Sequence, residues 1–77
     1  PAIENFTQAL TYYQRLGDKY ASASNYTRMR FAETLYLANR IDQAKYIFAQ
    51  IDPNELGEYY KDTYNSIAQR LAFDLLQ

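Results

Sequence analysis

The sequence predicts an all-α protein of four antiparallel amphipathic helices. Apolar residues recur at steps of three and four through most of the chain, which is the spacing of one helix face. Gly and Pro occur only twice each among 77 residues, and helix-favouring residue types are plentiful. We expect a single domain over residues 1–77, with helices at about 2–17, 25–38, 42–51 and 53–76.

The first expected helix carries a single apolar stripe and ends at a glycine. Gly17 suits a helix C-terminus, where a left-handed conformation is accessible without strain. Residues 18–25 are small and polar and are the predicted linker, in which Ser22, Ser24 and Asn25 are candidate N-caps of the second helix. The stripe itself consists of Ile3, Phe6, Leu10, Tyr13, Leu16 and Tyr20.

The second and third expected helices form a hairpin. Asn39 tolerates the left-handed conformation that ends a helix, and Asp42 can cap the next one. A connection this short forces the two helices to run antiparallel. The expected inner positions are Met29, Ala32, Leu35 and Tyr36 in the second helix, and Ala44, Ile47, Phe48 and Ile51 in the third.

The fourth expected helix has the clearest start signal in the chain. Asp52 and Glu55 make a capping box around Pro53, which suits the first helical position, so the helix should begin at Pro53. Its stripe is Leu56, Tyr60, Tyr64, Ile67, Leu71 and Leu75. Tyr59, Phe73 and Leu76 lie off that stripe, and a helix in a small monomer needs only one. They are therefore predicted to form an exposed interaction surface.

The hairpin resembles a tetratricopeptide repeat. Ala44 followed four residues later by Phe48 matches the second helix of such a unit, and Phe31, Ala32 and Leu35 fall in register in the first. The resemblance implies close contact between Ala32 and Ala44, and a right-handed array of helix-turn-helix units. A closed four-helix bundle is the alternative architecture.

The resemblance has clear departures. Arg28 stands at the usual Trp position, Asn39 replaces the usual turn Gly, and Pro53 comes three residues before the expected Pro, so this would be a degenerate repeat. The preceding segment, with its Tyr12-Tyr13 pair and Tyr20-Ala21-Ser22, is similar to bacterial cell-envelope tetratricopeptide-like proteins. The YfgM family, membrane-anchored ancillary proteins of the Sec translocon, is one such group.

Composition argues against catalysis and against strongly charged partners. The chain has no Cys and no His, which removes disulfides, thiolate metal sites and the commonest general base. The net charge is −1, so no strong field attracts nucleic acid or an anionic membrane. We therefore expect no enzyme activity, no cofactor and no small-molecule substrate. The first fifty residues carry net +2 and residues 51–77 net −3, a dipole that could order neighbouring units.

Three groups of residues invite functional hypotheses beside simpler ones. Glu55, Glu58 and Asp62 are a candidate cation site, although a helix N-terminus alone explains acidic residues there. Arg28 and Arg30 ahead of a turn suggest a helix-turn-helix reader, but the helix that follows has one Lys and no Arg. The tyrosines at the stripe edges suit either a recognition surface or helix packing in which the hydroxyls stay exposed to solvent. They are Tyr12, Tyr26, Tyr36, Tyr46 and Tyr59.

The favoured function is a non-catalytic protein-interaction or scaffold module that binds a protein partner or a second copy. A structural or oligomerisation domain of a larger assembly is the first alternative, and a nucleic-acid-binding helical domain is the second. The chain begins at Pro1 and ends on Leu75-Leu76-Gln77, so we expect a fragment of a longer protein. No apolar run reaches ten residues, so none of these residues should span a bilayer. Cytoplasm and bacterial periplasm both remain open.

Overall fold

The computed structural model describes the backbone of residues 2–76 and the side chains of residues 2–72. All of its regular structure is helical and none of the described residues forms a strand, which confirms the all-α prediction. The four α-helices are α1 (Ala2–Leu16), α2 (Ala21–Leu37), α3 (Ile41–Phe48) and α4 (Lys61–Leu76). Single 3₁₀ turns form η1 (Asp18–Tyr20), η2 (Pro53–Glu55) and η3 (Glu58–Tyr60).

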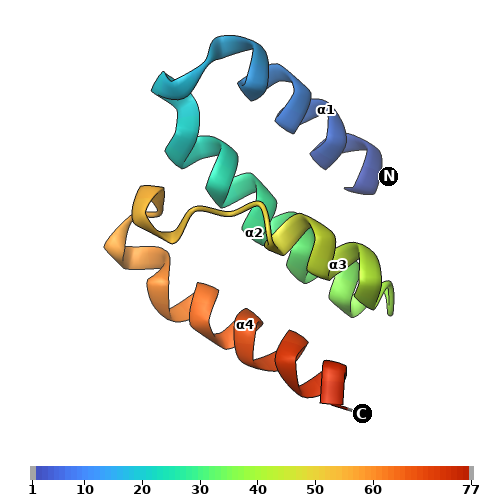
Figure 1. Ribbon diagram of the computed structural model, residues 1–77. Coiled ribbons are helices and arrows are strands. Elements are labelled where there is room, and N and C mark those ends of the chain that lie inside the picture. Colours follow the sequence, from blue (N-terminus) through green and yellow to red (C-terminus); the bar gives the residue numbers. More distant parts are fainter. Residues whose placement is uncertain (1, 77) are drawn as a thin grey trace.

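Helix α2 is the central element of the molecule. It packs mainly against α1 and α3, and it makes a smaller contact with α4. Figure 1 shows α1 and α4 on opposite sides of the α2–α3 hairpin. The Cα atoms span 38 × 29 × 16 Å, so the molecule is a thin slab.

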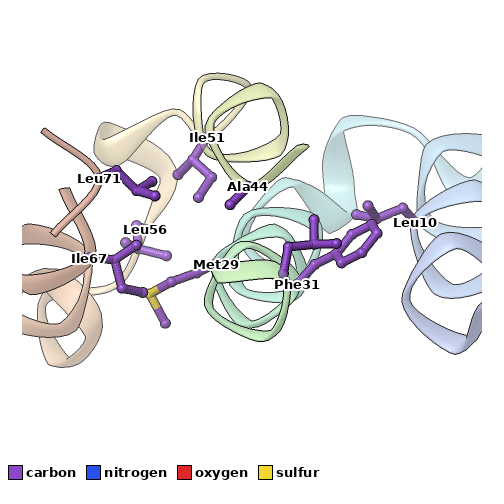
Figure 2. Packing of buried hydrophobic residues seen from close by; sticks show 9 residues of the cluster. Leu10, Met29, Phe31, Ala44, Ile51, Leu56, Ile67 and Leu71 are labelled. Carbon is purple, nitrogen blue, oxygen red and sulfur yellow. The ribbon is translucent and has the colours of Figure 1, made fainter. Parts of the chain in front are cut away.

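The core follows the predicted apolar stripes except at the end of α1, where Leu16 is 39% exposed. Ala32 and Ala44 are completely buried, and Met29 and Leu35 are the largest fully buried side chains. Figure 2 shows side chains from every α-helix and from the segment after α3 meeting around α2. The cluster of buried residues is Leu10, Met29, Phe31, Leu35, Ala44, Ile51, Leu56, Ile67 and Leu71.

The predicted linker at residues 18–25 is wrong in its second half. Gly17 does break the chain at a positive φ of 84°, but after one 3₁₀ turn α2 already begins at Ala21. Ser24 and Asn25 are therefore not N-caps; they lie inside the helix, 7% and 3% exposed. Asn25 can be buried because its amide bonds the backbone of Asp52 in both directions, at 3.1 and 3.3 Å.

The turn between α2 and α3 matches expectation at Asn39 and differs at Asp42. Asn39 adopts the left-handed conformation, with φ 61°, and the Arg40 amide donates to the Leu35 carbonyl at 2.8 Å. Helix α3 begins at Ile41, with Arg40 in the N-cap position and no side-chain cap bond. Asp42 lies instead in the first turn, where its charge still favours the helix.

Helix α3 is shorter than predicted. It ends at Phe48 instead of Ile51, and the amides of Gln50 and Ile51 donate to the carbonyls of Ile47 and Phe48, each at 3.1 Å. These bonds span three residues, so the last turn is tightened and the chain leaves the helix axis. Ile51 is nevertheless buried, as the stripe predicts.

The predicted start of the fourth helix is wrong, and of the predicted capping box only the Asp52 side-chain bond forms, because the Asp52 amide donates to Asn25 Oδ1 instead of to Glu55. The Asp52 carboxylate accepts from the Asn54 amide at 3.0 Å, and Pro53 occupies the first position of the turn. The element that Asp52 caps is the single turn η2, however, and α4 begins only at Lys61.

The reason for the interruption lies at Leu56 and Gly57. Both residues are extended, with ψ values of 132° and 151°, and Leu56 turns into the core at 4% exposure. The Ser22 hydroxyl donates to the Glu55 carbonyl at 2.7 Å. In a continuous helix that carbonyl would instead accept from the amide four residues later. Burial of Leu56 and this bond to α2 replace the continuation of the helix.

Candidate functional site

The five residues assigned to repeat-motif packing lie in the interior. Phe31, Ala32, Leu35 and Ala44 are buried, and Phe48 is half-buried. The Phe31 ring stacks on Phe6 of α1 with centroids 5.3 Å apart, and the Phe48 ring stacks on Tyr64 of α4 at 4.7 Å. These residues therefore join the hairpin to the helices on either side of it.

The predicted interaction surface is only partly described. Tyr59 is 87% exposed, and its ring meets the edge of Tyr60, which also contacts Tyr26. The side chains of Phe73 and Leu76 lie outside the described residues, so the proposed patch on α4 stays a prediction. Of the other edge tyrosines, Tyr12 and Tyr46 are well exposed and Tyr26 is at the margin, whereas Tyr36 is half-buried and packs against the core.

One apolar groove runs between α1 and α3 over the side of α2. We call it the α1–α3 groove; it has a volume of about 410 Å³. Its lining includes Ile3, Thr7, Phe31, Leu35, Tyr46 and Ile47. Tyr46 is 72% exposed at this site, so a large aromatic ring is left to solvent beside buried apolar side chains.

A second hollow is polar and lies where α1 ends and α2 begins. This polar cleft has a volume of about 520 Å³ and also takes in the segment that follows α3. Its lining includes Tyr13, Asp18, Ser24, Arg28, Asp52 and Glu55. These residues come from three separate stretches of the chain, which the bonds of Asn25 and Ser22 to the segment after α3 hold together.

Two polar groups in the polar cleft lack partners. The Nε of Arg28 is buried and has no acceptor within the described chain, while one terminal nitrogen of that guanidinium donates to Asn25 Oδ1 at 3.2 Å. The Ser24 hydroxyl, on a residue that is 7% exposed, makes no hydrogen bond to any residue that the structure describes. Buried polar groups are usually bonded, so Arg28 Nε is an unsatisfied donor enclosed by the protein, whereas the Ser24 hydroxyl oxygen is not fully buried and reaches the cleft.

The charge of the polar cleft is predominantly negative. Asp18, Asp52 and Glu55 face a single cation, Arg28. Among residues 2–72 the ion pairs are Arg30 with Glu33 at 3.8 Å and Lys61 with Glu58 at 2.8 Å. Neither pair involves a lining residue, so the carboxylates of the cleft are not neutralised by contact.

The sequence does not predict this cleft. Ser24 and Asn25 were predicted as N-caps, and Arg28 was considered with Arg30 ahead of a turn, whereas Arg28 is half-buried beside Asn25. One signal was available: Ala21, Ser24, Asn25 and Arg28 recur at the helical spacing directly before Met29. A polar stripe continuing an apolar one indicates a helix face that stays inside the molecule.

Three findings concern other kinds of site. No three His, Cys, Asp or Glu side chains of the described residues are arranged to hold a metal ion. Glu58, one of the predicted carboxylates, pairs with Lys61, and Asp62 is exposed. None of the helices, over the residues described, combines the length and apolarity needed to cross a bilayer.

Comparison of this chain with protein-family models, with curated proteins and with solved structures finds no match.

Proposed function

We propose that this chain is a non-catalytic protein-interaction or scaffold module of tetratricopeptide-like type, and that a partner protein packs a helix into the α1–α3 groove. The observation that carries the proposal is the exposed ring of Tyr46 beside an apolar groove of about 410 Å³. Aromatic residues are enriched at the centres of protein interfaces, and an amphipathic helix is the usual occupant of such a groove.

The arrangement of the helices supports an open array over a closed bundle. In a closed four-helix bundle the first and last helices pack against each other around one core. Here α1 and α4 flank the hairpin from opposite sides, and the slab is only 16 Å deep (Figure 1). The complete burial of Ala32 and Ala44 is also what a close contact between the two hairpin helices requires.

Site-specific photo-crosslinking in cells tests the proposal. A benzophenone amino acid in place of Tyr46 should give an adduct with another protein, and the same probe at Gln69, an exposed position on α4, should not. Thr7→Arg, which obstructs the groove from α1, should abolish the Tyr46 adduct. No adduct, or adducts that are equal at both positions and insensitive to Thr7→Arg, would contradict the proposal. An adduct of two copies would favour the oligomerisation alternative.

A further inference from the structure

We propose that the polar cleft binds a basic segment of the partner protein. The carboxylates of Asp18 and Glu55 receive a lysine or arginine side chain of that segment, and the Ser24 hydroxyl donates to one of its main-chain carbonyls. This inference rests on the proposed function as a protein-interaction module and adds the chemistry of the partner.

The Ser24 hydroxyl can donate to an oxygen atom of a ligand. The hydroxyl of Thr27, one turn further along the same face of α2, donates to the Ala23 carbonyl at 2.9 Å. This bond to the carbonyl four residues earlier is common for hydroxyl side chains in helices. Ser24 makes no such bond within the described chain, although it is buried beside the cleft. A peptide carbonyl of a bound segment can accept from this hydroxyl.

The carboxylates select a positive partner. Asp52 already accepts from the Asn54 amide at 3.0 Å, but the carboxylates of Asp18 and Glu55 have no hydrogen bond or ion pair to any described residue. A lysine or arginine entering the cleft meets these two unpaired charges. An acidic segment would be repelled by them, and it would find only Arg28 to compensate.

The aromatic wall of the polar cleft suits the same occupant. Tyr13 lines the cleft, and its ring is held by Tyr20, with centroids 6.1 Å apart. The chain's own Lys19 already places its ammonium 5.4 Å from the centroid of Tyr20, so this cluster accommodates a cation on a ring face. The stem of a bound lysine, or the plane of an arginine, can lie against Tyr13 in the same manner.

Binding of synthetic peptides tests the inference. The probe is a set of short, labelled, N-acetylated and C-amidated peptides with a central Lys-Arg pair in a background of small uncharged residues. Matched sets carry Gln-Gln or Glu-Glu at the centre. Fluorescence polarisation should show the tightest binding for the basic set, and that binding should weaken as salt is raised because the charges are partly exposed.

Variants of the lining carboxylates locate the binding. Asp18→Asn and Glu55→Gln should each weaken the basic peptides by about fivefold, which corresponds to a partly exposed ion pair. Glu4→Gln is the matched control, because it makes the same charge change on an exposed residue of α1 outside the cleft. Circular dichroism checks that each variant keeps its helix content.

Ser24→Ala separates main-chain recognition from fold. The hydroxyl makes no hydrogen bond within the described protein, so its removal should leave the melting temperature unchanged or raise it. It should still weaken the basic peptides severalfold, because a donor to their main chain is lost. A variant that melts lower without changed binding would assign Ser24 to the fold alone and overturn its proposed role.

Two outcomes would overturn the whole inference. Basic peptides that bind no better than the Gln-Gln set, or that are insensitive to both carboxylate variants, would show that the polar cleft does not select a cation. Preference for the Glu-Glu set would make Arg28 an anion site instead. If Tyr46 crosslinks a partner while the basic peptides fail to bind, this inference fails and the proposed function stands; absence of the Tyr46 crosslink is evidence against the proposed function itself.

Discussion

Asn25 fastens the segment after α3 to the central helix. Its side chain is 3% exposed and bonds both the amide and the carbonyl of Asp52, and it also accepts from Arg28. Asn25→Ala leaves those backbone groups without partners, so we expect the free energy of unfolding to fall by about 1–3 kcal/mol. Urea denaturation measures the change. Asn65→Ala, on an exposed face of α4, should change stability by less than about 0.5 kcal/mol, and equal losses would contradict the assignment.

Ala44 has no room for a larger side chain. It is completely buried on α3, whose main neighbour is α2, and Ala32 of α2 is completely buried as well. Ala44→Leu forces additional methylene groups into this contact and should cost about 1–3 kcal/mol in thermal unfolding. Ala49→Leu makes the same change at an exposed position of the same hairpin and should be nearly neutral. An unchanged melting temperature for Ala44→Leu would show that the helices do not approach closely there.

At the scale of elements, the two glycines differ in what they require of the backbone. Gly17 has φ 84°, and an added Cβ would meet no atom within 4 Å, so any cost of Gly17→Ala comes from the backbone alone. We expect a loss of about 1–2 kcal/mol. Gly57 has an ordinary φ of −62°, so Gly57→Ala should be neutral or stabilising by up to about 1 kcal/mol. Chemical denaturation of both variants tests the contrast, and the same sign for both would contradict it.

The cap at η2 gives a second element-scale prediction. Asp52 accepts from the Asn54 amide through a side-chain oxygen, which Asp52→Asn retains and Asp52→Ala removes. We expect a loss of about 1 kcal/mol for the alanine variant and much less for asparagine, as measured by thermal unfolding. Equal losses would indicate that the charge of Asp52, and not its hydrogen bond, stabilises the turn.

Helix faces were predictable at this scale, but helix ends were not. The stripe positions Leu10, Leu35 and Ile67 are buried because a spacing of three or four is a local property of the chain. The ends depend on partners distant in sequence: Asn25 lies inside α2 because Asp52 satisfies it, and η2 stops because Ser22 takes the carbonyl of Glu55. The capping signal at Asn25 was a local preference that its hydrogen bonds to Asp52 overrode, and the signal at Pro53 begins a turn that does not continue as a helix.

The polar cleft was beyond prediction for the same reason. Tyr13, Ser24 and Glu55 belong to three separate segments, and nothing in the spacing within any one of them brings them together. The apolar groove was easier to predict, since Leu35 was placed on the inner face of the second helix and Phe31 in the register of the repeat. That α1 and α3 would leave a groove between them depends on the angles at which the helices pack, which the pattern does not specify.

At the scale of the whole molecule, the proposed open array predicts that stability is not shared evenly. Helix α1 packs on α2, whereas α2 contacts every other α-helix. In an array each unit is held by its neighbours alone, so an end element can open while the rest stays folded. Native-state hydrogen exchange should therefore show the amides of α1 exchanging at a lower free energy than the central amides of α2.

Variants that act on one end of the slab sharpen this prediction. Phe6→Ala removes the ring that stacks on Phe31 and should raise exchange in α1 while leaving α4 unchanged. Ile67→Ala removes a buried side chain of α4 and should raise exchange in α4 while leaving α1 unchanged. In a closed bundle the four helices share one core, so each variant would raise exchange throughout by the same amount. Uniform loss of protection would thus reject the array, and independent loss at the two ends is the behaviour expected of stacked helical units.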